Sequence, residues 1–104
     1  MERIEALLTE TPDDPFLRYG LAMEYASAGD DAGCVAVLRD LIARSAADPY
    51  IPAYLQAGQA LARLDRTDEA AAVLREGIEA AAKAGTPDAL HARGEMMGLR
   101  ATVE

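Results

Sequence analysis

The sequence contains little of what catalysis, metal binding and disulfide bonding need. Among its 104 residues there is one cysteine, one histidine, one phenylalanine and no tryptophan. A single cysteine excludes an internal disulfide and a multi-cysteine metal site, and a single histidine excludes any site that needs two. No serine or cysteine has a sequence context that supports a nucleophile. We therefore expect no catalysis, no metal and no cofactor.

Positive charge and long apolar runs are also scarce. The chain carries 10 basic against 18 acidic residues, which gives a formal net charge of −8. Nucleic acids and anionic membranes attract Lys and Arg, so this balance disfavours both as partners. No stretch is long and apolar enough to span a bilayer, and the acidic N-terminal sequence MERIEALLTE is no signal peptide. These features predict a cytoplasmic protein.

Helix-forming residues are abundant. Apolar residues make up 51% of the chain, and alanine is prominent among them. Segments rich in Ala and Leu, with few β-branched residues, favour tightly packed helices over sheet. Pro15, Pro52 and Pro87 suit the first turn of a helix, where the missing N–H costs nothing. The expected helices are 2–10, 15–28, 31–46, 52–64, 67–84 and 87–103, and no strand is expected.

Local signals predict where these helices begin and end. Thr67 and Thr86 have the residue type and position of N-caps, and Gly29 suits a left-handed turn at a helix end. Two aspartate pairs can be imagined as metal ligands, but helix-start and turn chemistry explains them more simply. These pairs are Asp13/Asp14 and Asp30/Asp31.

Two octets nearly repeat each other. VAVLRDLI at 35–42 and AAVLREGI at 71–78 lie 36 residues apart and share five identical positions. In both segments the apolar residues fall on one face of a helix. A helix pair repeating at this spacing cannot bury its apolar face alone and must stack on a neighbour.

The 36-residue spacing extends into the preceding helices. Gly58 corresponds to Ala22 and Gly94, and Leu61 corresponds to Tyr25 and Met97. Small residues at the first set of positions would allow close helix contacts, and larger residues one turn later would fill the core. We expect core filling by Met97, and burial of Cys34 as a small apolar residue between paired helices.

These positions resemble the tetratricopeptide repeat family, whose pattern is aromatic-x₂-Leu-Gly-x₂-Tyr, then Ala-x₃-Phe, then Pro. The second unit carries Tyr54, Ala57, Gly58, Leu61, Ala70 and Leu74. The first unit carries Leu21, Ala22, Tyr25, Cys34, Leu38 and Pro49. Arg18 departs from the pattern at the aromatic position. The resemblance covers residues 15–98.

The resemblance implies an all-α fold: an α-solenoid of two helix-turn-helix repeats between an N-terminal cap helix and a C-terminal capping helix. We expect a single domain over 1–104, divided into the cap (1–11), repeat 1 (15–48), repeat 2 (52–85) and a C-terminal helix (87–104). About three repeats are usual for stability, so a homodimer that completes the core is an open alternative.

The resemblance further implies a concave face, lined by the first helix of each repeat, that binds a protein or peptide segment. The expected binding residues are Phe16, Tyr19, Met23, Leu55, Gln56, Gln59, His91 and Glu95. The cationic clamp that some members use for acidic tails is missing, because Tyr19, Met23, Gln56, Asp88 and Ala92 stand at its positions. An alternative is a structural protein whose groove is filled by its own first helix, or a subunit of a larger assembly.

Overall fold

The computed structural model describes residues 14–103, which form helices and connecting turns without a strand. The helices are α2 (Pro15–Ser27), α3 (Asp31–Arg44), α4 (Ile51–Arg63), α5 (Thr67–Ala84) and α6 (Pro87–Val103). Their ends lie within two residues of the predicted ones. The expected cap helix over 2–10 lies outside the described residues.

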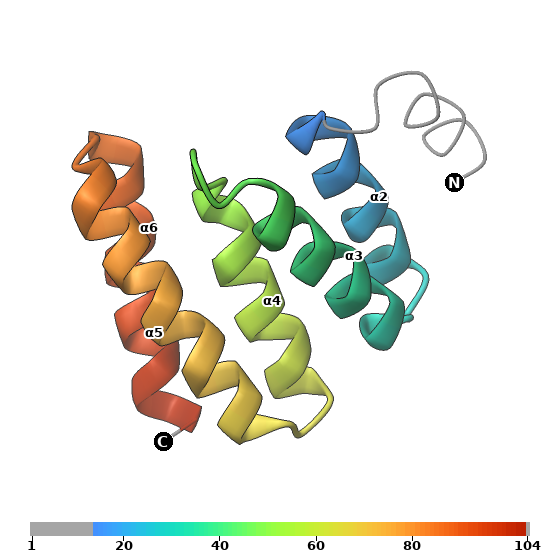
Figure 1. The fold of residues 1–104 in the computed structure, drawn as a ribbon. Coiled ribbons are helices and arrows are strands. Elements are labelled where there is room, and N and C mark those ends of the chain that lie inside the picture. Colours follow the sequence, from blue (N-terminus) through green and yellow to red (C-terminus); the bar gives the residue numbers. More distant parts are fainter. Residues whose placement is uncertain (1–13, 104) are drawn as a thin grey trace.

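The helices stack in chain order (Figure 1). Each packs against the next, and α4 also packs against α6. No comparable contact joins α2 to α4. The array is therefore two helix pairs, α2/α3 and α4/α5, followed by α6, which takes the place of the first helix of a third unit. This confirms the predicted all-α solenoid.

Side chains cap three of the helices as expected. Asp14 Oδ1 accepts hydrogen bonds from the backbone N–H of Phe16, at 2.9 Å, and of Leu17. Asp30 Oδ1 accepts from Gly33 N at 2.8 Å, and Thr86 Oγ1 from Ala89 N at 3.2 Å. These bonds satisfy backbone donors that have no partner within the helix.

The prediction for Thr67 was wrong. Thr67 is the first residue of α5, and Arg66 occupies the N-cap position without a side-chain cap bond. The Arg66 guanidinium instead bonds the carboxylate of Glu69, in the first turn of α5. An acidic residue at this end still suits the helix dipole, as expected.

The turn between paired helices repeats as well. Gly29 ends α2 with φ of 81°, and Asp65, 36 residues later, follows α4 with φ of 61°. Both residues adopt the left-handed conformation, which glycine takes at no steric cost and aspartate tolerates. Equivalent backbone geometry at this spacing supports the repeat independently of the side chains.

The two octets, each with the residue that precedes it, supply the centre of the core. Cys34 and its equivalent Ala70 are fully buried, as are Leu38 and its equivalent Leu74. Packing against α4 is close: a methyl group built at Gly58 would lie 2.4 Å from Leu74 Cδ2. The predicted burial of Cys34 and of Gly58 is therefore confirmed.

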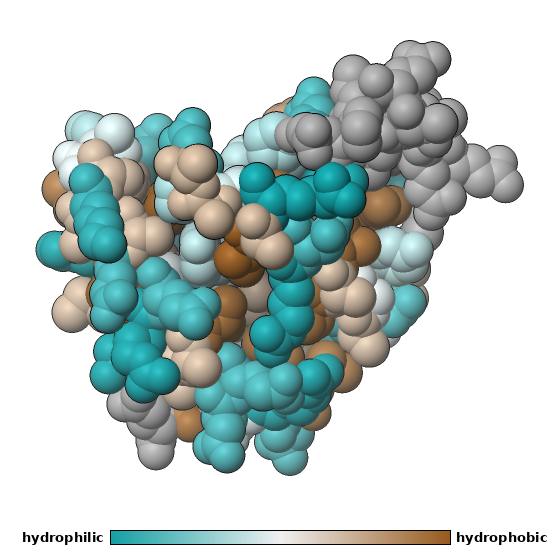
Figure 2. Space-filling model, viewed as in Figure 1, coloured by the Kyte–Doolittle hydropathy of each residue, from teal (hydrophilic) through white to brown (hydrophobic). Residues whose placement is uncertain are grey.

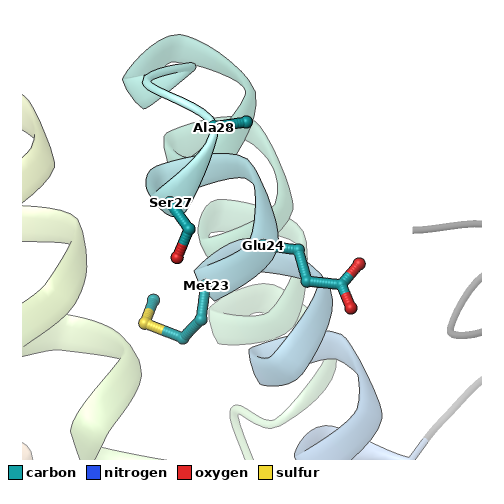
Figure 3. A pocket seen from close by; sticks show the side chains of 4 residues that line it. All are labelled: Met23, Glu24, Ser27 and Ala28. Carbon is teal, nitrogen blue, oxygen red and sulfur yellow. The ribbon is translucent and has the colours of Figure 1, made fainter.

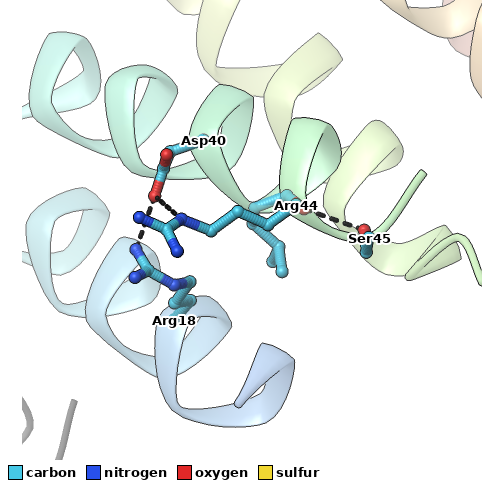
Figure 4. Close-up of polar contacts among 5 residues, drawn as sticks. Arg18, Asp40, Arg44 and Ser45 are labelled. Atoms are coloured by element: carbon cyan, nitrogen blue, oxygen red, sulfur yellow. Dashed lines mark hydrogen bonds and ion pairs between the residues drawn. The ribbon is translucent and has the colours of Figure 1, made fainter. Parts of the chain in front are cut away.

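Arg18, at the position where the family prefers an aromatic residue, has a specific partner. Its guanidinium forms an ion pair with Asp40 of α3, which also accepts from Arg44 Nε at 3.0 Å (Figure 4). In the second repeat the equivalent positions hold Tyr54 and Glu76, and Glu76 is close enough to raise the pKa of Tyr54 after the larger effect of burial. The substitution thus replaces aromatic packing by an ion pair between the same two helices.

The predicted core contribution of α6 needs correction. Met97 is 53% exposed, Gly94 has no neighbouring atom within 4 Å of a built methyl group, and Met96 is fully buried instead. Met96 reaches the preceding helix: a methyl group at Gly77 of α5 would lie 2.6 Å from Met96 Sδ. In α4 the face that carries Gly58 is covered by α5, whereas no described helix covers the equivalent face of α6.

Candidate functional site

The residues predicted for the binding face lie on the first helix of each unit. Phe16, Tyr19 and Met23 belong to α2; Leu55, Gln56 and Gln59 to α4; His91 and Glu95 to α6. Those on α4, with Tyr19 and Met23, are partly buried. Tyr19, Met23 and Leu55 pack against the hydrophobic core.

Tyr19 connects α2 to the start of α4. The side chain of Gln56 lies close enough to lower the pKa of Tyr19 by hydrogen bonding, and the Tyr19 ring lies 5.3 Å, centroid to centroid, from the ring of Tyr50. This separation is within the range of favourable aromatic pairs, and the rings are tilted by 44°. Burial raises the pKa of Tyr19, and Tyr50 raises it further, while the bond to Gln56 lowers it. The junction is therefore a partly desolvated aromatic site.

Met23 lies one helical turn beyond Tyr19 and lines an open hollow with Glu24, Ser27 and Ala28. In Figure 3 the side chains of Met23 and Ser27 point toward α4, and that of Glu24 points the other way. The exposed lining of this hollow is mostly apolar. A thioether beside an aromatic junction provides an adaptable apolar contact for a side chain from another molecule.

A second hollow, of about 430 Å³, lies between the start of α4 and the start of α6. Its lining includes Tyr50, Asp88 and Ala92. Asp88 and Ala92 hold two of the clamp positions, so the structure places an acid where a cation would be needed.

Tyr50 was missed by sequence reasoning. It touches Tyr19 on one side and lines the second hollow on the other. The sequence PYIP at 49–52 indicates only a boundary between segments. Because Tyr50 precedes α4, helical periodicity carried no information about the direction of its ring.

The residues at the two ends of the predicted binding face lie apart from those at its centre. Phe16, in the first turn of α2, is 70% exposed. His91 and Glu95 lie four residues apart on α6, with His91 Nε2 3.0 Å from Glu95 Oε1, and their side chains are largely exposed. The structure thus brings Tyr19 and Gln56 together and leaves Phe16, His91 and Glu95 at the margins.

The second helices, by contrast, carry many charges. Hydrophilic side chains cover much of the surface over α3 and α5 in Figure 2, with apolar residues visible between them. The ion pair of Arg39 on α3 with Glu69 on α5, at 3.1 Å, is one example. Exposed pairs of this kind contribute little to stability, but they keep the surface solvated.

Cys34 should be chemically inert in the folded protein. Burial raises the pKa of its thiol above the ordinary value of 9.0, against a smaller lowering by Arg63. We expect a thiol-specific disulfide reagent to label Cys34 slowly at pH 8 and rapidly once the protein is unfolded, because the thiolate is the reactive form. Rapid labelling of the native protein would contradict the burial of Cys34.

The same raised pKa makes stability depend on pH. Folding favours the neutral thiol, so Cys34 stabilises the protein fully below about pH 9 and loses that contribution as the pH rises through its folded pKa. Denaturant titrations at pH 8 and 10 should show a larger loss for the native chain than for Cys34→Ala. Tyr19 and Tyr54, whose pKa values burial also raises, account for a further loss above about pH 10 in both proteins.

Metal-ligand clusters and membrane-spanning helices are both absent from residues 14–103. Within residues 14–103 no group of three or more His, Cys, Asp or Glu side chains is placed to hold a metal ion. Among the helices of this part of the chain, none is long and apolar enough to cross a membrane.

No family model and no curated protein matches the chain. Solved structures do. The solution structure of a tetratricopeptide repeat domain protein from Salinibacter ruber has 33% sequence identity and a TM-score of 0.74, over 89% of each chain. A crystal structure of a tetratricopeptide repeat domain protein from the same organism has 32% identity and a TM-score of 0.72, over 86% of this chain and 94% of that one. With identity and coverage at this level, on the same helical array, the chain belongs to the tetratricopeptide repeat family.

Proposed function

We propose that this protein is a non-catalytic interaction module of the cytoplasm that binds an apolar or amphipathic segment of a partner protein on its concave face. Membership of the family supports protein interaction in general. The observation that carries the finer proposal is the partly buried junction of Tyr19, Tyr50 and Gln56 between two hollows.

The chemistry of this face favours an apolar ligand. Tyr19, Met23 and Leu55 supply aromatic and flexible apolar surface, which contributes most of the binding energy in helix-in-groove recognition. Gln56 and Gln59 can fix the orientation of a bound backbone or polar side chain through hydrogen bonds. No cation occupies a clamp position, and Asp88 would repel a carboxylate that entered the second hollow.

A titration with two fluorescent peptides tests the proposal. We expect an amphipathic helical peptide to bind in the micromolar range and a peptide with an acidic C-terminal tail to show no measurable binding. Met23→Glu should weaken the amphipathic peptide roughly tenfold or more, because it places a charge in the apolar hollow.

The matched control is Ala36→Glu, which adds the same charge at an exposed position of α3. This variant should bind like the native chain, and circular dichroism should show that both variants are folded. Tighter binding of the acidic peptide, or equal effects of the two substitutions, would contradict the proposed groove chemistry.

A further inference from the structure

One face of α6 is apolar and uncovered. Leu90, Gly94, Met97 and Ala101 follow the spacing of a single helix face, and all four are exposed. We call these four residues the α6 strip. Leu90 is 41% and Met97 53% exposed, and with Phe16 they are the large hydrophobic residues that the described chain exposes most.

The repeat explains what this strip is built to contact. Counting back 36 residues, Leu90, Gly94 and Met97 correspond to Tyr54, Gly58 and Leu61 of α4. Those α4 residues are buried beneath α5, where Leu74 fills the space over Gly58. The α6 strip is thus the face that accepts a second helix within a repeat, and no helix among residues 14–103 lies on it.

The strip also borders a surface hollow beside α5. A small hollow of about 190 Å³ lies between α5 and α6 and is lined by Ile78, Met97, Arg100 and Ala101. A helix placed on the strip would close this hollow and extend the existing α5/α6 interface. The surface offered is therefore continuous with the packed core.

We propose that a second copy of this chain covers the strip, with the two α6 helices antiparallel about a two-fold axis. In that arrangement the partner's Met97 lies over Gly94 and the partner's Ala101 lies opposite Leu90, and both contacts recur by symmetry. Each layer then pairs a large residue with a small one, as Leu74 does with Gly58 inside the chain. Self-complementarity of this kind selects a second copy over an unrelated helix.

Charge and area set the strength of this contact. The strip itself carries no charge, and the nearest acid in the sequence, Glu95, has its carboxylate 3.0 Å from His91 Nε2 on the same helix. Two chains of net charge −8 nevertheless repel each other, so added salt should strengthen the dimer by screening that repulsion. One helix face buries less than the roughly 1,200 Å² of a standard stable interface, so the dimer is weak and forms at high micromolar concentration.

Sedimentation velocity from low micromolar to near-millimolar concentration tests the proposal. We expect the native chain and Ala36→Glu to shift from monomer to dimer over this range. Met97→Glu should weaken dimerisation roughly tenfold or more, because it places an unpaired carboxylate in the apolar contact over the partner's Gly94. Gly94→Met should weaken it equally, because two methionines then compete for one space.

The exchange of both residues makes the test specific for the geometry. The double variant Gly94→Met with Met97→Gly again pairs large with small and should recover most of the native affinity. A native chain that stays monomeric throughout would overturn the proposal. So would a dimer that Met97→Glu leaves unchanged, or a double variant as weak as Gly94→Met alone.

Discussion

Gly58→Leu should lower the free energy of unfolding by roughly 1–3 kcal/mol, because the added side chain overpacks a closed contact. A single methyl group at this position already comes within 2.4 Å of Leu74 Cδ2. Leu74 is fully buried, so it cannot make room by turning into solvent. In a domain of this size each kcal/mol corresponds to about 4–8 °C in melting temperature, so a thermal melt followed by circular dichroism resolves the effect.

The repeat provides a matched control. Gly94 is the equivalent glycine of α6, and nothing lies within 4 Å of a methyl group built there. At low protein concentration Gly94→Leu should therefore be neutral or stabilising by up to about 1 kcal/mol, because leucine favours a helix more than glycine does. Equal melting temperatures for the two variants would show that α4 and α5 do not pack as described.

Leu74→Ala should cost more, roughly 2–5 kcal/mol, because it removes buried apolar atoms and leaves a cavity beside Gly58. Leu38→Ala, at the equivalent position of the first octet, should cost a similar amount, since Leu38 is also fully buried. Urea titration measures both losses. Leu90→Ala is the control: with Leu90 41% exposed, its cost should stay well below that of either core substitution. Comparable costs at all three positions would contradict the assigned core.

Much of this core could be predicted from the sequence, because the two octets contain its central residues. Local periodicity placed Leu38 and Leu74 on the buried face, and the 36-residue spacing identified Gly58 as a small residue at a close helix contact, where Leu74 packs. Both predictions depend on neighbours that lie within the same repeat. Backbone signals such as Pro15 and Gly29 likewise act over a few residues, so the helix ends were close to those observed.

Contacts between residues that lie far apart in the chain could not be predicted from the sequence. The spacing assigned Met97 to the core, which was wrong. It could not show that no helix among residues 14–103 covers that position. Arg18 finds its partner 22 residues away on α3, and no local pattern indicates that pairing. In the candidate site, the contact between Tyr19 and Tyr50 was not predicted, for the same reason. The placement of Tyr19 and Gln56 on one face was predicted from the alignment of the two repeats alone.

Binding of the partner segment on the concave face is tested most directly by NMR chemical-shift mapping during titration with the amphipathic peptide. Our account predicts that the largest changes fall on Tyr19, Met23, Leu55 and Gln56. Exposed residues of α3 and α5, such as Arg39 and Arg75, should change little. Changes concentrated on α3 and α5, or on the α6 strip alone, would show that a different surface binds the partner and would contradict the proposed function.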